Sequence, residues 1–240
     1  LGRFVSILSA VIPELKPMVG FQQHSPHHAY DVFTHTAHVV EAVPKEPSLR
    51  WAALLHDAGK PAAFTMDENG RGHFKGHAKI SQQIADSVLL RLKAPSALRQ
   101  QVTELIGLHM TKLEPDKKLL RRRLGKLGQD RLEQLLELQE ADMGSKGTGK
   151  QQDTEQFSRI RDMLETIRQE NSCLQIKDLA VDGGDLIALG YTPGPALGKC
   201  LEHLLNLVLD EEIPNEKDVL LKKEKNLPEN IATNRKIKDG

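Results

Sequence analysis

The sequence is poor in cysteine and in aromatic residues and has no long apolar run, and each shortage excludes a class of protein. Two cysteines, Cys173 and Cys200, allow at most one disulfide and lack metal-ligand spacing, which fits a reducing cytoplasm. No apolar stretch approaches the roughly 18 residues of a membrane span. Aromatic residues make up 4% of the chain, which argues against a base-stacking platform. We therefore expect a cytoplasmic protein with no membrane partner.

The chain also has no excess charge of either sign, because 33 acidic residues balance 33 basic ones. Overall charge therefore argues neither for nor against a nucleic-acid partner. A length of 240 residues with 39% hydrophobic content is enough for one large or two small domains with a buried core. The chain begins with Leu1 rather than methionine, from which we expect part of a longer protein or a trimmed chain.

Apolar residues recur at helical spacing over most of the chain, which predicts an all-α fold. One helix is expected around 4–12 and a second from Asp31 to Val43. Ser48 is the expected N-cap of a third helix, which ends at His56. Further helices are expected over 77–93, 96–110 with Ser96 as cap, 117–126, 129–143, 152–171, 195–209 and a short stretch to about 225.

Three stretches interrupt this pattern. Residues 61–76 lack helical spacing, and Asn69-Gly70 is a hairpin-type turn signal, which predicts a small flap. The glycine-rich stretch from Gly144 to Gly149 is the clearest candidate for a domain boundary. The polar end over 226–240 has no periodicity and is expected to be disordered.

The doublet His56-Asp57, in the run Leu-Leu-His-Asp-Ala-Gly-Lys60-Pro, places a nitrogen and an oxygen donor side by side. His35 lies within one expected helix and Asp142 ends another. Donors on separate helices can meet only if the helices form a bundle around them. Imidazole and carboxylate without thiolate suit a divalent Mn, Mg, Ni, Zn, Co or Fe ion. We therefore predict a metal site, at which a bound water could become a nucleophile.

This order of residues resembles the HD superfamily of metal-dependent phosphohydrolases, whose motif is a His, a later His-Asp pair and a distal Asp. His35, His56-Asp57 and Asp142 match it. The resemblance implies that Asp57 and Lys60 act in catalysis, with Lys60 meeting a substrate phosphate. His77 and His109 fall where some members have ligands for a second metal, which Asp57 would bridge. Asp31 would orient His35.

Simpler roles stand beside these. A lone buried histidine such as His109 is more often a hydrogen-bonded core residue than a metal ligand, and Lys60 alone would be a surface lysine. His38 and His203 are taken as structural. His24, His27 and His28 form a polar cluster that is either solvated or lines the mouth of the site.

The flanking sequence resembles the bacterial tRNA nucleotidyltransferases, the CCA-adding enzymes of the poly(A) polymerase family that carry an HD domain. The residues that carry this similarity are Ile12-Pro13-Glu14-Leu15, Gly20-Phe21-Gln22-Gln23, Leu120-Arg121-Arg122-Arg123-Leu124, Asp182-Gly183-Gly184-Asp185-Leu186 and Gly194-Pro195-Ala196-Leu197-Gly198. The resemblance implies a remnant of a helical body over 1–30, an HD domain over 31–143 and a helical tail over 150–225.

The nucleotidyl-transferring head of that family needs a glycine-rich turn followed by an Asp-x-Asp pair. No such arrangement occurs here, so polymerase activity is not expected from this chain alone. The resemblance implies hydrolysis of nucleotide or RNA-end phosphates such as 2′,3′-cyclic phosphates. The alternatives are a non-catalytic tRNA-binding module, whose head is missing or encoded elsewhere, and a piece of a CCA-adding enzyme.

A basic cluster over 117–126 is the strongest candidate for contact with RNA. Clustered lysine and arginine could neutralise backbone phosphates without reading bases. A solvated basic helix face explains the same pattern equally well. The residues concerned are Lys118, Arg121, Arg122 and Lys126.

Overall fold

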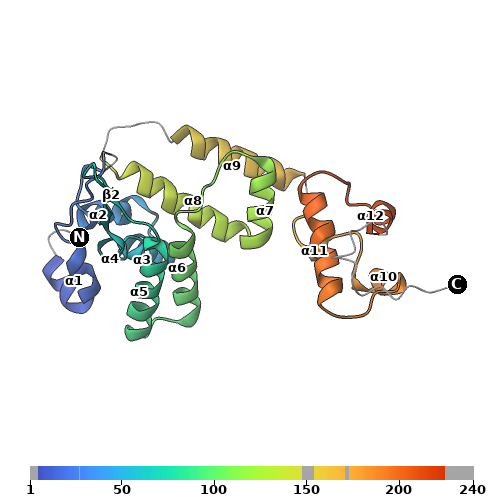
Figure 1. Cartoon of the computed structure of the whole chain (residues 1–240), viewed down its shortest axis with the longest axis horizontal. Coiled ribbons are helices and arrows are strands. Elements are labelled where there is room, and N and C mark those ends of the chain that lie inside the picture. The colour runs from blue at the N-terminus through green and yellow to red at the C-terminus, as the bar shows by residue number, and fades with distance from the viewer. Residues whose placement is uncertain (1–4, 27, 148–153, 171–172, 225–240) are drawn as a thin grey trace. The chain divides into compact units, whose positions relative to one another are not determined.

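The computed structural model describes residues 5–26, 28–147, 154–170 and 173–224, which form twelve α-helices and one two-stranded hairpin (Figure 1). The predicted all-α fold is confirmed. No helix in these ranges is long and apolar enough to cross a membrane. The end over 226–240, for which disorder was expected, lies outside the described residues, as does His27.

The chain forms two compact units, and it passes between them three times. The first unit contains residues up to Lys112 and then Asp130–Phe157; the second contains Leu113–Gln129 and the chain from Ser158 onward. Helix α7 (Lys117–Leu127) therefore belongs to the second unit, although the family resemblance assigned it to a continuous domain over 31–143. The physical reason is that α7 packs against α11 (Pro195–Leu209) in that unit.

The first unit is a helical bundle with a leucine-rich core. Helices α5 (His77–Arg91) and α6 (Ser96–Leu108) lie side by side, as Figure 1 shows, and α3 (Pro47–Leu55) packs on α6 and on α2 (Val32–Ala42). Its other helices are α1 (Val5–Val11), the 3-10 helix η2 (Pro13–Met18), α4 (Lys60–Ala63) and most of α8 (Gln129–Gly144). Fully buried core residues include Leu49, Leu55, Leu89, Leu105 and Ile106.

The helix starts differ from two sequence-based expectations by one or two residues. Helix α3 begins at Pro47, and Ser48 donates a hydrogen bond to Glu46 at 2.8 Å instead of capping the helix. Helix α6 begins at Ser96, after Pro95. Pro47 sets the start of α3, because its fixed φ suits a first turn and its missing N–H needs no partner there. Pro95 instead lies just before α6, at the N-cap position with extended backbone.

The expected flap is present as an antiparallel hairpin of β1 (Thr65–Met66) and β2 (Gly72–His73). Gly70 supplies the left-handed turn, with φ of +73°. The flap is anchored to the preceding loop because the Gly72 N–H donates to the His24 carbonyl at 2.9 Å.

The second unit has its own apolar core, formed by residues including Tyr191, Cys200, Leu201, Leu204 and Leu220. Besides α7, most of α9 (Thr154–Gln169) and α11, it contains the 3-10 helix η3 (Ile176–Asp178), α10 (Gly183–Ala188) and α12 (Lys217–Glu224). The motif Asp182-Gly-Gly-Asp185 is a capping box that starts α10, since each aspartate accepts a backbone N–H of the other. Helix α10 was not predicted, because six residues are too few for a visible helical period.

Candidate metal centre

The structure brings the four predicted residues of the first unit together. His35 comes from α2, His56 follows α3 directly, and Asp142 lies near the end of α8. The His35 Nε2 atom is 2.9 Å from Asp142 Oδ1, and the His56 Nε2 atom is 3.9 Å from the same oxygen. One ligand atom of each of these three residues lies within 4.8 Å of the others.

A second group with the same spacing contains Asp57, His77 and His109. His77 begins α5 and His109 follows α6, so the contact between those two helices positions both imidazoles. Their Nε2 atoms are 3.1 Å apart, and Asp57 Oδ1 is 3.3 Å from that of His77 and 4.0 Å from that of His109. All three residues are buried.

Asp57 lies between the two groups and offers a different oxygen to each. Its Oδ1 faces His77 and His109, whereas its Oδ2 is 3.2 Å from the His56 Nε2 and 3.6 Å from the His35 Nε2. Such a carboxylate could bridge two cations. The His56 Nε2 lacks a hydrogen bond within the described part of the chain, and a buried polar atom of this kind calls for a partner such as an ion or a water. The Oδ2 atom is paired with the Lys60 ammonium at 2.8 Å.

The backbone orients all four imidazoles in the same way. In each ring the Nδ1 atom lies close to a backbone carbonyl oxygen. The pairs are His35 with Ser145 at 3.2 Å, His56 with Ala53 at 2.8 Å, His77 with Phe74 at 2.8 Å and His109 with Ile106 at 2.7 Å. A carbonyl oxygen can only accept, so each Nδ1 carries the proton. When the ring is neutral, each Nε2 therefore offers a lone pair to the centre. This tautomer is the one that a histidine needs in order to bind a metal through Nε2.

The electrostatics of the centre favour ionised carboxylates. Burial opposes ionisation of Asp57, but the charges of His56 and Lys60 outweigh burial and hold its pKa well below the usual range. The pKa of Asp142 is also lowered against the effect of burial, through the hydrogen bond from His35 and the charge of His56. Burial opposes protonation of His56 too, yet Asp57 raises its pKa. These anionic oxygens beside imidazole nitrogens form a donor set that suits a divalent cation.

Lys60 differs from its expected place at a phosphate, because its ammonium group is enclosed. The residue is 6% exposed, and its Nζ lies 2.8 Å from both Asp57 Oδ2 and Gln23 Oε1. Asp31 also differs from expectation. Its carboxylate caps α2 by accepting the N–H groups of Phe33 and Thr34, and the partner of the His35 Nδ1 is Ser145 instead.

Of the polar histidine cluster, His28 lies beside the centre. Its ring meets that of His35 edge-on, with centroids 5.7 Å apart. Burial, together with the charge of Lys60, lowers the pKa of His28 to about 4. His28 therefore lines the centre as a neutral imidazole and is not part of a solvated cluster.

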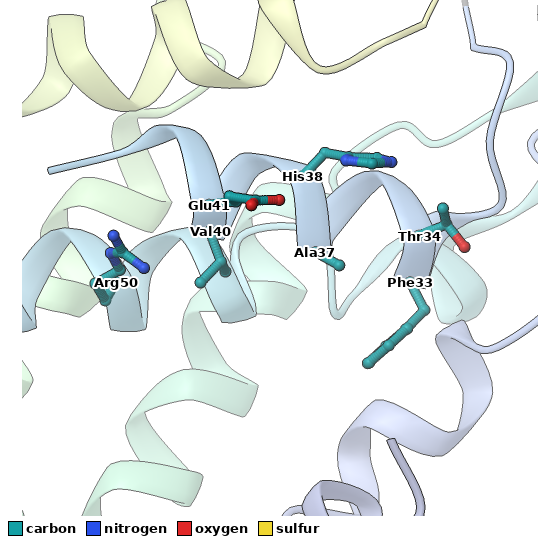
Figure 2. A pocket seen from close by; sticks show the side chains of 7 residues that line it. All are labelled: Phe33, Thr34, Ala37, His38, Val40, Glu41 and Arg50. Atoms are coloured by element: carbon teal, nitrogen blue, oxygen red, sulfur yellow. The ribbon is translucent and has the colours of Figure 1, made fainter. Parts of the chain in front are cut away.

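His38 lies on a groove along α2, outside the centre. The groove has a volume of about 470 Å³. Figure 2 shows His38 and Glu41 on one side of α2 and Phe33 and Val40 on the other, with Arg50 from α3 at one end. The groove holds one carboxylate and one imidazole, too few donors for a metal site, which agrees with a structural role for His38.

In the second unit, the basic side chains of α7 are engaged by acidic residues that follow α11. Arg121, which is 6% exposed, donates to Glu211 at 2.9 Å. Lys118 and Arg122 contact Asp210 at 3.0 and 2.5 Å. Contact of these side chains with phosphate stays a prediction, because ion pairs within the unit now also explain the basic pattern.

Glu211 has a backbone conformation that normally favours glycine, with φ of +58°. It follows Asp210, the C-cap of α11, and its N–H and that of Glu212 donate to the carbonyls of Val208 and Leu207 at 3.1 and 3.0 Å. This arrangement is a Schellman motif. The carboxylate of Glu211 also forms an ion pair with Lys117 at 3.0 Å.

Two residues important to the centre were not singled out by sequence reasoning. Gln23 is 2% exposed and accepts a hydrogen bond from Lys60, but the sequence marked it only as part of the stretch Gly20-Phe21-Gln22-Gln23 and gave no signal of a role beside the centre. Gly59 has room for a hydrogen atom only: a Cβ there would lie 2.6 Å from the His77 carbonyl oxygen and 2.7 Å from the Ser81 nitrogen. Its place between Asp57 and Lys60 was the one available hint.

Comparison with known proteins gives the family. The chain is 30% identical over 207 residues to the A-adding tRNA nucleotidyltransferase of Deinococcus radiodurans, covering 83% of this chain and 47% of that protein. It is 31% identical over 207 residues to the CC-adding tRNA nucleotidyltransferase of Thermus thermophilus, covering 84% and 46%. A multifunctional CCA protein of Azoarcus is 40% identical over 100 residues, covering 39% and 23%.

The chain thus spans about half the length of the first two relatives. Residues 73–223 match the family described as tRNA nucleotidyltransferase domain 2, putative. This match covers His77, His109 and Asp142 in the first unit and most of the second. The chain therefore belongs to the tRNA nucleotidyltransferase domain 2 family.

Proposed function

We propose that the first unit is an HD-type, metal-dependent phosphohydrolase that acts on nucleotide or RNA-end phosphates such as 2′,3′-cyclic phosphates. The observation that carries the proposal is the convergence of four Nε2 lone pairs and two carboxylates at one buried centre. The His77 and His109 Nε2 atoms are 3.1 Å apart with Nδ1 protonated in both rings, so their lone pairs face each other until a metal ion or a proton binds there.

The side chains at this centre would form two neighbouring sets of metal ligands. His35, His56 and Asp142 would hold one cation, His77 and His109 a second, and Asp57 would bridge them. A divalent cation in such a site supplies Lewis-acid activation of water and of a phosphoryl oxygen. The chain supplies rigid ligands, because the Nδ1 contacts fix each ring. It also supplies a buried cation, Lys60, that offsets the charge of Asp57.

The test is hydrolysis of 2′,3′-cyclic AMP by the purified chain with added Mn, Ni or Mg. Asp57→Ala removes the carboxylate between the two groups and should lower activity and metal affinity at least about 100-fold. Asp86→Ala, on the exposed side of α5, is the matched control and should leave both unchanged. A folded wild-type protein that turns over no cyclic nucleotide with any of these metals would exclude this activity.

A second candidate is a tRNA-binding part of a nucleotide-adding enzyme. It is favoured by the similarity to an A-adding and a CC-adding tRNA nucleotidyltransferase. A groove of about 800 Å³ in the second unit is lined by Arg122, Lys126, Lys177 and Asn206, among others, and could follow a phosphate backbone. Binding of unmodified tRNA to the purified chain at several salt concentrations tests it. A salt-sensitive affinity supports the candidate, and its absence excludes it.

A further inference from the structure

The candidate metal centre is closest to solvent at Asp142. The side chain of this residue is 18% exposed, whereas those of the other five candidate ligands are between 1% and 7% exposed. We therefore expect a substrate to reach the centre beside Asp142. The residues that surround this carboxylate decide which chemical groups can bind there.

Two segments of the chain meet at this opening. The Ala29 N–H donates to the Lys146 carbonyl at 2.9 Å, and the carbonyl of the neighbouring Ser145 lies 3.2 Å from the His35 Nδ1. His28 directly precedes the first of these residues, and Lys146 follows closely after the ligand that α8 supplies. The backbone therefore holds both His28 and Lys146 at the edge where the centre opens.

His28 lies beside the ligands without belonging to them. Its ring meets that of His35 edge-on, but neither group of ligand atoms includes a nitrogen of His28. Its Nδ1 is buried and has no hydrogen-bond partner among the residues that the structure describes. A buried polar atom of this kind calls for a partner such as a water or a ligand. Because a neutral imidazole carries one N–H, His28 can donate a hydrogen bond to an oxygen that enters the centre.

Lys146 can supply the charge that the enclosed Lys60 cannot. Lys60 is buried and paired with Asp57 at 2.8 Å. Lys146 is half-buried, and it forms no ion pair within the described part of the chain. Burial chiefly lowers the pKa of His28, and the charges of Lys60 and Lys146 lower it further, so both ammonium groups lie near that ring. An ammonium without a counter-ion beside a metal centre attracts anions.

We infer that His28 and Lys146 form a phosphate-binding rim at the opening of the metal centre. The Lys146 ammonium balances the charge of the phosphate, and the His28 imidazole donates a hydrogen bond to one of its oxygens. This inference rests on the proposed function, and it gives Lys146 the phosphate contact that the sequence predicted for Lys60. Because the rim binds the phosphate group itself, it should hold inorganic phosphate as well as a nucleotide.

The experiment is a calorimetric titration of inorganic phosphate into the full chain loaded with Mn²⁺. His28→Leu and Lys146→Met should each weaken phosphate binding about 10–100-fold, the effect of losing one hydrogen bond to a charged group. Both variants should bind Mn²⁺ like the wild type, because neither residue belongs to the ligand groups. In hydrolysis of 2′,3′-cyclic AMP, kcat/KM should fall by a similar factor.

Three further variants separate contact with phosphate from damage to the fold. His28→Gln keeps a hydrogen-bond donor and Lys146→Arg keeps the charge, so both should retain more phosphate affinity than the Leu and Met variants. Lys45→Met removes an exposed lysine from the loop between α2 and α3 and should bind phosphate like the wild type.

The outcomes distinguish the rim from the proposed activity. Wild-type phosphate affinity in His28→Leu and Lys146→Met, or an equal loss of Mn²⁺ affinity, would overturn the inference while cyclic-nucleotide hydrolysis by the wild type stands. Phosphate binding that depends on both residues, in a chain that hydrolyses no cyclic nucleotide, would support the rim and exclude only that activity. A wild-type chain that binds no Mn²⁺ would overturn both.

Discussion

Substitution of Gly59 by alanine gives the sharpest test of how the centre is packed. An added Cβ would lie 2.6, 2.7 and 2.8 Å from the His77 carbonyl oxygen, the Ser81 nitrogen and the Ile80 Cβ. All three atoms belong to the first turns of α5 and cannot rotate away. Helix α5 would have to retreat by about 0.8 Å to reach the ordinary contact distance of 3.4 Å.

The expected cost combines two effects. Overpacking of this kind destabilises by about 1–3 kcal/mol. The Gly59 N–H also donates to Ser81 Oγ at 2.9 Å, and weakening that hydrogen bond adds about 1 kcal/mol. A total of roughly 2–4 kcal/mol lowers the melting temperature by roughly 4–16 °C in a chain of this size. The retreat of α5 also moves His77 away from Asp57, so the affinity of the group Asp57, His77 and His109 for a metal ion should fall.

Thermal denaturation monitored by circular dichroism measures the loss of stability, and the number of metal ions bound per chain measures the effect on the centre. Gly198→Ala in α11 is the matched control, because a Cβ there meets no atom within 4 Å. It should stabilise the protein by about 1 kcal/mol through helix propensity. A Gly59→Ala protein that melts with the wild type and binds the same amount of metal would refute this account of the packing.

Two further outcomes follow from buried charge and from backbone strain. In the metal-free protein, burial and the charge of His56 lower the pKa of His109 to about 4. Between about pH 6.5 and pH 4, this histidine therefore takes up a proton only in the unfolded chain. The free energy of unfolding should fall by roughly 2 kcal/mol by about pH 5. In urea denaturation, the His109→Gln variant should lose less stability over the same pH range. At Glu211, whose φ is +58°, substitution by alanine should cost about 1 kcal/mol more than substitution by glycine. Equal urea midpoints for those two variants would contradict the proposed strain.

The residues of the centre could be predicted from the sequence because their side-chain types and their order along the chain are distinctive. His35, His56-Asp57 and Asp142 are side chains of the right kind in a specific order, and helical periodicity places His35 within one helix and the others at helix ends. The helical fold was predictable for the same reason: amphipathic helices of eleven or more residues, such as α2, show a clear period.

What could not be predicted depends on contacts between distant residues. The Ser145 carbonyl that orients His35 lies 110 positions away, and any residue could have supplied it. The enclosure of Lys60 by Gln23 spans 37 positions and uses an amide with no pattern of its own. Periodicity also cannot tell which apolar surface a helix covers, so it could not show that α7 packs against α11.

The threefold passage of the chain between its two units has a consequence for its synthesis. Helix α7 leaves the ribosome long before α11, the helix that covers it, yet α8 with Asp142 follows immediately. A nascent chain can therefore complete the first unit, with its candidate metal centre, while the apolar residues Leu120 and Leu124 of α7 are still uncovered. No single cut separates the units, because cleavage after α8 would leave α7 without its partner. Exchange of the second unit between relatives would consequently require matched changes in two separate stretches of the gene.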